Sequence, residues 1–178
     1  MESRLQVILV NEQDEAVGVM EKLEAHQKAV LHRAFSVFIF NSRGEMLLQQ
    51  RAFSKYHSGG LWTNACCGHP SPGEQTADAA ARRLGEEMGF TTQLDELFDF
   101  IYRSELDNGL TEYELDHVFA GTWDAPVYPV KEEVNDFCYL SLDEIKQRLD
   151  SNPQQYTVWF RIIFPRVEAW ARKSVLTA

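Results

Sequence analysis

Apolar and polar segments alternate through the first part of the chain in a pattern that predicts two β-hairpins. The expected strand pairs are residues 6–10 with 17–20 and residues 33–40 with 45–50, each joined by a short polar stretch. Residues 33–40 are apolar almost throughout, without a polar face, which indicates a strand buried on both sides. We therefore expect this strand to lie in the interior of the fold.

Residues 74–88 carry the clearest helical pattern. Apolar residues recur there every three or four positions, and Gly89 follows, where a helix C-terminus favours glycine. A second helix is expected from the capping-box sequence at 141–144 to about residue 149. An aromatic-rich helix should begin near residue 156 and be kinked or interrupted near Pro165. Further strands are expected at residues 97–103, 112–123 and 136–140.

The order of these elements indicates the fold class. Strands, one helix, more strands and then helices, without regular strand–helix–strand alternation, predict an α+β protein: an α/β sandwich with a mixed sheet flanked by helices. With 178 residues, 44% of them apolar, the chain is expected to form a single domain over residues 1–178. The longest apolar run is too short to span a bilayer, and the N-terminus lacks the features of a signal peptide. We therefore expect a cytoplasmic protein with no membrane partner.

The net charge limits the class of partner. A formal charge of −10 argues against a nucleic-acid surface, which needs a basic face. An anionic substrate would need a local basic pocket or a bridging divalent cation. The three cysteines, two of them adjacent, cannot make a disulfide framework, so we expect reduced thiols. Whether the protein is a monomer or a homodimer is left open.

The stretch from Asn64 to Glu74 places thiols, an imidazole and turn residues directly before the predicted helix, and loops on a rigid scaffold often carry sites. Its spacing closely resembles the Nudix box, a loop–helix–loop motif whose carboxylates hold divalent metal on a diphosphate. The matching positions are Gly68, Glu74, Arg82, Leu84, Glu86, Glu87 and Gly89. Arg83 stands where the box has glutamate, which removes a metal ligand and adds a phosphate-binding guanidinium. Taken alone, Arg83 and Glu87 would form an ordinary ion pair one helical turn apart.

Several other polar residues allow two interpretations. Glu112 and Glu114 point to one face of a predicted strand, so both carboxylates could reach one ion, or both could face solvent. Cys67 could be a thiolate favoured by an electropositive helix N-terminus, or an ordinary packed thiol. The spacing of His26 and His32 fits no ligand pair on one helix. The remaining cysteines and histidines are expected to be structural: Cys66, Cys138, His57 and His117.

Four sequence blocks together resemble the type 1 isopentenyl-diphosphate Δ-isomerases, a likeness that runs from about residue 21 to residue 159. The blocks are residues 31–38, 48–51, 61–70 and 112–114, and the Thr-Asn-x-x-Cys-Gly-His-Pro sequence is distinctive within Nudix proteins. Arginine at the position of Arg83 is usual in that family. The resemblance implies a Nudix fold and a metal-dependent isomerase of isoprenoid biosynthesis, which interconverts isopentenyl and dimethylallyl diphosphate by protonation and deprotonation.

The resemblance also implies roles for individual residues. An octahedral ion, Mn²⁺ or Mg²⁺ in the first place and otherwise Fe²⁺, would be held by His26, His32, His69, Glu112 and Glu114. Glu87 would hold a Mg²⁺ that arrives with the substrate diphosphate. The diphosphate would be bound by Lys22, Arg51, Lys55 and Arg83, with Trp159 as an aromatic wall beside a transient carbocation. Cys67 and Glu114 would be the catalytic pair: Glu114, assisted by Tyr102, would deliver a proton on one face of the substrate, and Cys67 would take one on the other.

Two rival functions remain open. A Nudix diphosphohydrolase would use the same fold and metal, but Arg83 in place of glutamate argues against it, and phosphate release would support it. A catalytically silent Nudix-like binding module is the more distant alternative. Such a module has no reason to keep an oxidisable thiol beside three candidate ligands.

Overall fold

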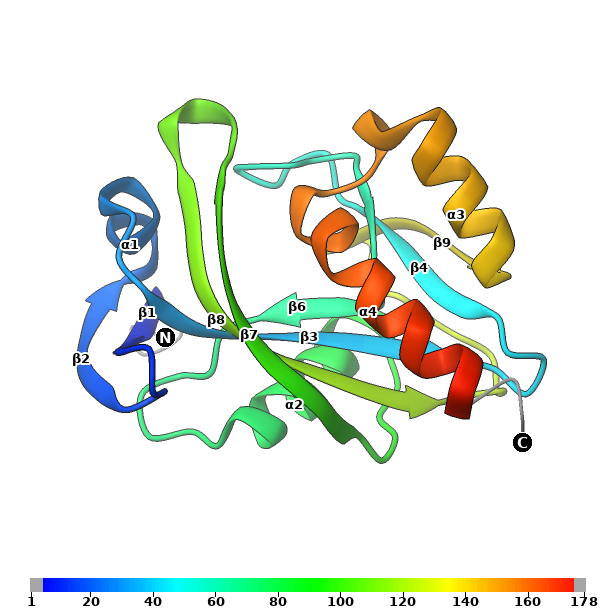
Figure 1. Cartoon of the computed structure of the whole chain (residues 1–178), viewed down its shortest axis with the longest axis horizontal. Helices are drawn as coiled ribbons and strands as arrows, with labels where there is room; N and C mark the ends of the chain where they lie inside the picture. The colour runs from blue at the N-terminus through cyan, green and yellow to red at the C-terminus, as the bar shows by residue number, and fades with distance from the viewer. Residues whose placement is uncertain (1–4, 175–178) are drawn as a thin grey trace.

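Figure 1 shows the computed structural model, which describes residues 5–174. A mixed nine-stranded sheet forms the middle of the molecule, with helices on both of its faces. The strands are β1 (Gln6–Val10), β2 (Ala16–Glu21), β3 (His32–Phe40), β4 (Met46–Arg51), β5 (Trp62–Thr63), β6 (Cys66–Gly68), β7 (Asp95–Glu105), β8 (Thr111–Thr122) and β9 (Val134–Leu140). The helices are α1 (Lys22–Lys28), α2 (Thr76–Met88), α3 (Leu142–Ser151) and α4 (Val158–Ser174), with short 3-10 helices at η2 (Asp107–Gly109) and η3 (Pro153–Gln155). The predicted α+β sandwich is confirmed.

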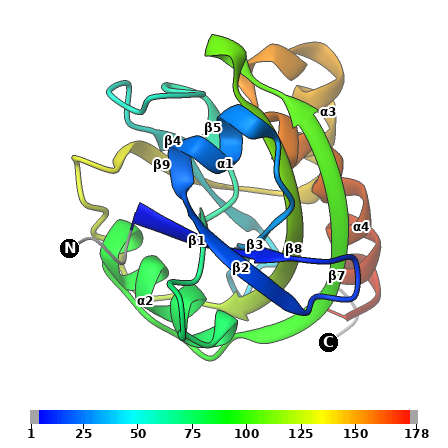
Figure 2. The same ribbon diagram turned by 90° about the vertical axis from the view of Figure 1, so that its left-hand side faces the viewer.

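Strand β3 is buried on both faces, as its apolar sequence predicted. Phe38 and Phe40 belong to the core that α3 and α4 cover, whereas Val37 and Ile39 belong to the core that α2 covers. Figure 2 shows these helical layers on opposite sides of the sheet. Because successive side chains of a strand point to opposite faces, a strand with two apolar faces must be covered on both.

The first predicted hairpin is confirmed, and the second is correct only at its turn. Strands β1 and β2 pair antiparallel along their length. Strands β3 and β4 are also antiparallel but pair only at Phe40 and Met46, and beyond that point β6 lies beside β3 and β9 beside β4. An apolar pattern predicts that strands exist, but the rest of the chain decides which strands become neighbours.

Strands β7 and β8 form a long antiparallel hairpin, and β8 also pairs in parallel with β3. The parallel register begins with His32 opposite Glu114. Strand β8 starts before this pair, so Glu112 lies on the part of the hairpin that extends past β3 and stands beside α1 (Figure 1). The sheet topology therefore brings a histidine and two carboxylates to one edge.

The predicted helices are present with small shifts in their ends. Helix α2 stops at Gly89, which has φ +77°, and a Cβ there would lie 2.3 Å from the carbonyl oxygen of Tyr128. Helix α3 begins with the predicted capping box of Ser141 and Glu144. The predicted interruption at Pro165 is wrong, because α4 continues through it from Val158 to Ser174. Buried apolar residues before and after Pro165 pack on the core and outweigh the lost backbone hydrogen bond.

Three short elements have no counterpart in the predictions. Helix α1 has seven residues, and β5 and β6 have two and three, which is too short for a periodic pattern to be recognised. Two of them carry candidate site residues, since His26 lies on α1 and Cys67 on β6.

Within residues 5–174, no helix is long and apolar enough to cross a membrane. The predicted domain limits at residues 1 and 178, and most of the N-terminal segment tested for a signal peptide, lie outside the described residues.

Candidate active site

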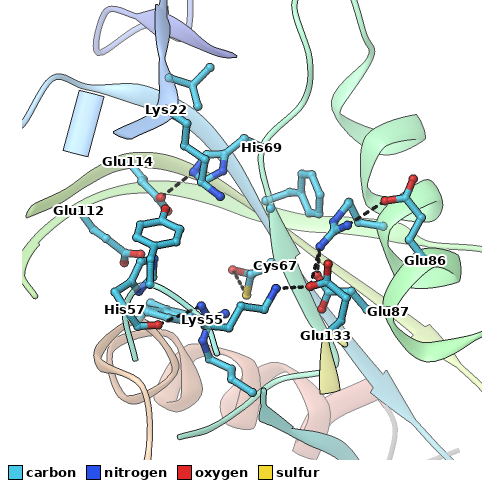
Figure 3. Close-up of a pocket in the computed structure, with 18 of the residues that line it drawn as sticks. Lys22, Lys55, His57, Cys67, His69, Glu86, Glu87, Glu112, Glu114 and Glu133 are labelled. Atoms are coloured by element: carbon cyan, nitrogen blue, oxygen red, sulfur yellow. Dashed lines mark hydrogen bonds and ion pairs between the residues drawn. The ribbon is translucent and has the colours of Figure 1, made fainter. Parts of the chain in front are cut away.

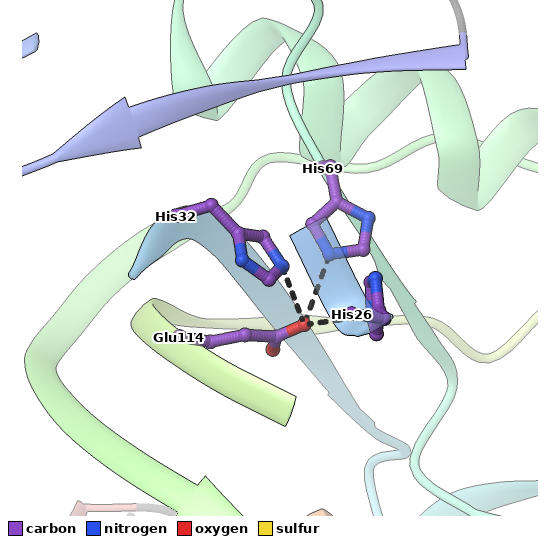
Figure 4. Close-up of side chains that lie close together, drawn as sticks. All are labelled: His26, His32, His69 and Glu114. Carbon is purple, nitrogen blue, oxygen red and sulfur yellow. Dashed lines mark hydrogen bonds and ion pairs between the residues drawn. The ribbon is translucent and has the colours of Figure 1, made fainter. Parts of the chain in front are cut away.

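Three histidines from separate elements converge on one carboxylate oxygen (Figure 4). Glu114 Oε1 lies 2.9 Å from His69 Nε2, 3.4 Å from His32 Nε2 and 4.0 Å from His26 Nε2. The ligand atoms of all four residues lie within 4.8 Å of one another. Three imidazoles and a carboxylate at this spacing form a candidate metal site.

The hydrogen bonds of the buried histidines show that this group fits a cation. His26 Nδ1 lies 2.7 Å from the carbonyl oxygen of Lys22, and His32 Nδ1 lies 2.8 Å from that of Val30. A carbonyl oxygen only accepts, so Nδ1 carries the hydrogen and Nε2 presents a lone pair. Both Nε2 atoms are buried and have no hydrogen-bond partner in the described part of the chain. Lone pairs directed at a carboxylate oxygen repel it unless a cation or a proton lies between them.

The protonation states of His26 and His69 also suit metal binding. Burial lowers the pKa of His26, and it lowers the pKa of His69 to about 3. Neutral imidazoles at physiological pH keep the lone pair that a divalent ion requires.

Tyr102 connects the two carboxylates of β8. Its hydroxyl lies 2.6 Å from Glu112 Oε2 and 2.8 Å from Glu114 Oε2, so both glutamates point to one face of the strand. Burial and the neighbouring charge of Glu114 raise the pKa of Glu112 well above its usual value. Burial opposes ionisation of Glu114 as well, but a proton or a cation between its Oε1 and the nitrogens of His32 and His69 lowers its pKa well below the usual value. A hydroxyl has one hydrogen to donate, so the two short contacts together require a proton on one of the two carboxyl groups, and the raised pKa of Glu112 assigns it there.

Of the five expected metal ligands, the structure brings four into the histidine cluster. Glu112 is grouped instead with His26 and His57, and its contact with Tyr102 connects it to Glu114.

The thiol of Cys67 is held by two neighbouring polar side chains. Asn64 Nδ2 lies 3.2 Å from the sulfur, and Ser36 Oγ lies 3.5 Å from it. Ser36 also donates a 2.8 Å hydrogen bond to Asp116 Oδ2. Burial and the charge of Asp116 raise the pKa of Cys67 well above its usual value. Of the two interpretations of Cys67, these surroundings favour the packed thiol, since burial beside a carboxyl group favours the protonated form.

The four basic residues that the resemblance assigns to a diphosphate line one cavity of about 280 Å³. Lys22 lies over the ring of Tyr56, and Arg51 lies over the ring of Trp159, 5.2 Å from its centroid. Burial lowers the pKa of Lys22. Lys55 contacts the carboxylate of Glu133 (Figure 3). Arg83 contacts the carboxylate of Glu87 in the same cavity.

All but two of the remaining expected residues line the same cavity: Cys67, His69, Tyr102, Glu112, Glu114, Glu87 and Trp159. Its volume is near the lower end of the range for small-molecule sites, which suits a short substrate. His26 and His32 lie behind this lining, next to Glu114.

Two acidic residues of the Nudix box, Glu74 and Glu87, make different contacts. Glu74 accepts hydrogen bonds from Arg82 Nε at 2.7 Å and from the backbone of Ser71 at 2.8 Å, which fixes the loop before α2. Glu87 is buried and accepts a 2.8 Å hydrogen bond from Gln49. Arg83 and Glu87 do form the ion pair that their spacing allowed.

Several residues of the site were missed by the sequence interpretation. Asp116 follows Glu114 on the same face of β8, so the two-residue period of a strand could have identified it. His57, expected to be structural, is buried in the cavity wall with its ring 5.8 Å from that of Trp159. No local pattern singled out Ser36 or Asn64. His117 lies outside the cavity between Glu96 and Asp14.

Comparison with known proteins agrees with this geometry. Residues 30–160 match the model of the NUDIX domain, the class that fold and helix motif define. A crystal structure from Deinococcus radiodurans has the same fold, with a TM-score of 0.69 at 20% identity over 83% of this chain and 90% of that one.

Closer relatives narrow the class. An isopentenyl-diphosphate Δ-isomerase of Pectobacterium atrosepticum is 54% identical over 91% of this chain and 90% of its own length. One from Burkholderia multivorans is 44% identical over 97% of this chain and 100% of its own. The chain therefore belongs to the type 1 isopentenyl-diphosphate Δ-isomerases of the Nudix superfamily.

Proposed function

We propose that this protein interconverts isopentenyl diphosphate and dimethylallyl diphosphate, with Cys67 and the Glu114–Tyr102 pair as the proton-transfer groups. The observation that carries the proposal is that both groups line the same small cavity as the basic residues. Shifting the double bond requires a proton to be added at one carbon and another to be removed elsewhere in the allylic unit. Two acid–base groups in one small cavity meet that requirement.

Hydrogen bonds and burial support the following positions for the two protons. Glu112, with its raised pKa, keeps a proton that the Tyr102 hydroxyl connects to Glu114. Cys67 is also protonated, and Asn64 Oδ1 lies 3.3 Å from its sulfur. Trp159, which is buried beside Arg51, offers a ring face to positive charge on the substrate carbon and helps to exclude water.

His26, His32, His69 and Glu114 would hold a divalent ion, for which we propose Mn²⁺ or Mg²⁺. When bound, such an ion supplies positive charge that orients Glu114 and makes neighbouring acid groups stronger proton donors. Glu87 would contact a second ion, Mg²⁺, that accompanies the substrate diphosphate, and Lys22, Arg51, Lys55 and Arg83 would bind the phosphate oxygens.

Proton NMR of isopentenyl diphosphate incubated in D₂O with the protein and Mg²⁺ or Mn²⁺ tests the proposal. We expect dimethylallyl diphosphate that contains deuterium. Release of phosphate or pyrophosphate would instead support the Nudix diphosphohydrolase. Unchanged substrate with every metal would contradict both the isomerase and the hydrolase activity.

A further inference from the structure

The four basic residues of the cavity are not equivalent. Within residues 5–174, Lys22 and Arg51 have no carboxylate partner at ion-pair distance, and the buried Nε of Arg51 has no hydrogen-bond partner. Lys55 and Arg83 instead form ion pairs with acidic residues of the same cavity. One half of the basic set is thus free to receive an anion, and the other half is already neutralised.

A single carboxylate oxygen lies between the two ion-paired cations, Lys55 and Arg83. Glu133 Oε2 contacts Lys55 Nζ (Figure 3). The same oxygen lies 3.4 Å from Arg83 Nη2. One oxygen shared by an ammonium and a guanidinium is the arrangement that a phosphate oxygen would adopt between the same two cations.

The backbone holds Glu133 in this place. Its N–H donates a 3.0 Å hydrogen bond to the carbonyl oxygen of Val130, and its carbonyl oxygen accepts one of 3.0 Å from the N–H of Ala52. Ala52 begins the loop that carries Lys55. The hydrogen bond between Ala52 and Glu133 therefore fixes the main chain near Lys55 relative to the main chain of Glu133. The neighbouring Val134 is buried, which anchors the turn to the core.

The local charge also disfavours an incoming anion. Arg83 contacts Glu86 at 2.8 Å and Glu87 in addition to Glu133. Lys55 and Arg83 together therefore face three carboxylates, and a diphosphate that approaches them meets no excess of positive charge.

We propose that Glu133 is an internal competitor of the substrate diphosphate and makes diphosphate binding depend on a divalent cation. One phosphate binds Lys22 and Arg51, and the other has to displace the Glu133 carboxylate from Lys55 and Arg83. The displaced carboxylate and Glu87 then lie beside the phosphate, where a divalent cation offsets the repulsion among them. Glu133 in this way selects a metal-complexed diphosphate over a free one.

Calorimetric titration of inorganic pyrophosphate into the wild type, Glu133→Gln and Glu132→Gln tests this competition. Glu132 is the matched control, because it adjoins Glu133, carries the same charge and is exposed. Without added divalent cation, Glu133→Gln should bind pyrophosphate at least about threefold more tightly than the wild type. The variant lacks the partly exposed ion pair between Glu133 and Lys55, so pyrophosphate does not have to break it. Glu132→Gln should match the wild type.

The second part of the test is the dependence on Mg²⁺. The ratio of pyrophosphate affinity with Mg²⁺ to affinity without it should be smaller for Glu133→Gln than for both other proteins. Equal ratios, or weaker metal-free binding by Glu133→Gln than by Glu132→Gln, would overturn the proposal. Thermal melts should show that the three proteins are equally folded.

This inference rests on the proposed diphosphate-binding function, and the titrations separate the two. If the wild type does not bind pyrophosphate even with Mg²⁺, both the basic diphosphate site and the role of Glu133 are wrong. If the wild type binds and the variants do not differ, only the role of Glu133 is wrong.

Discussion

Asn64 holds the thiol of Cys67 between two of its own atoms: Nδ2 lies 3.2 Å from the sulfur and Oδ1 lies 3.3 Å from it. The same Nδ2 also donates to the carbonyl oxygens of Val37 at 2.9 Å and Cys66 at 2.8 Å. Asn64 is fully buried. Its side chain therefore links the position of the thiol to the backbone of β3 and β6.

Replacing Asn64 with alanine should lower stability and turnover together. The two carbonyl oxygens would lose a buried donor, which costs roughly 1–3 kcal/mol, and the thiol would lose its fixed orientation. Chemical denaturation measures the first effect, and isomerase kinetics the second. Unchanged turnover in a folded Asn64→Ala protein would show that the orientation of the thiol is not set by this contact.

Cys67→Ser and Cys66→Ser should differ sharply. Cys67 lines the cavity, whereas Cys66 is buried in the core beneath α2. A hydroxyl is a much poorer acid or base than a thiol, so Cys67→Ser should lower turnover by at least about 100-fold with substrate affinity largely kept. Cys66→Ser should keep its turnover and lose some stability. Steady-state kinetics on both variants checks this, and near-normal turnover of Cys67→Ser would contradict the proposed role.

Replacing His69 with alanine should reduce metal binding more than stability. His69 is the closest histidine to Glu114 and lines the cavity. Metal content after dialysis should fall by at least about tenfold, while the melting temperatures of the metal-free wild type and variant should stay similar. Cys138→Ser, which removes a potential ligand atom that belongs neither to the cavity nor to a candidate metal group of the described residues, is the control for metal content. A large loss of metal-free stability in His69→Ala would show that His69 is structural.

The Glu74–Arg82 pair should stabilise the protein only above acidic pH. The hydrogen bond from Arg82 is the largest cause of the lowered pKa of Glu74. A carboxyl group with a lowered pKa in the folded state contributes its full stability above its unfolded pKa of about 4.3 and loses it as pH falls through the folded value. Arg82→Gln should therefore be less stable than the wild type by roughly 1 kcal/mol at pH 7. The difference should shrink below about pH 4, as urea denaturation across this range would show. A difference that does not change with pH would mean that Arg82 acts through packing.

The sequence by itself predicted the elements whose signals lie within a few neighbouring residues. The glycine that ends α2, the capping box of α3 and the doubly buried strand β3 were all recognised locally, because caps and hydrophobic periodicity depend on adjacent positions. The spacing of the Nudix-box residues likewise identified α2 as the helix of the site. Pro165 shows the limit of local rules, since packing on the core carries α4 past it.

Tertiary structure alone decided how the site is assembled and how its groups are charged. His26 and His32 meet only because the short helix α1 lies beside β8, and the parallel register of β3 and β8 places His32 opposite Glu114. The spacing of these residues along the chain could not show that they form one site. Only the resemblance to a known family assigned them to a common metal site before the structure was considered. The sequence left open whether Cys67 is a thiolate or a packed thiol, and neither the sequence nor the resemblance foresaw the bridge from Glu133 to Lys55. Both the protonation of the thiol and the bridge depend on burial and on neighbours distant along the chain, and desolvation and Coulomb energy are determined by separation in space rather than in sequence.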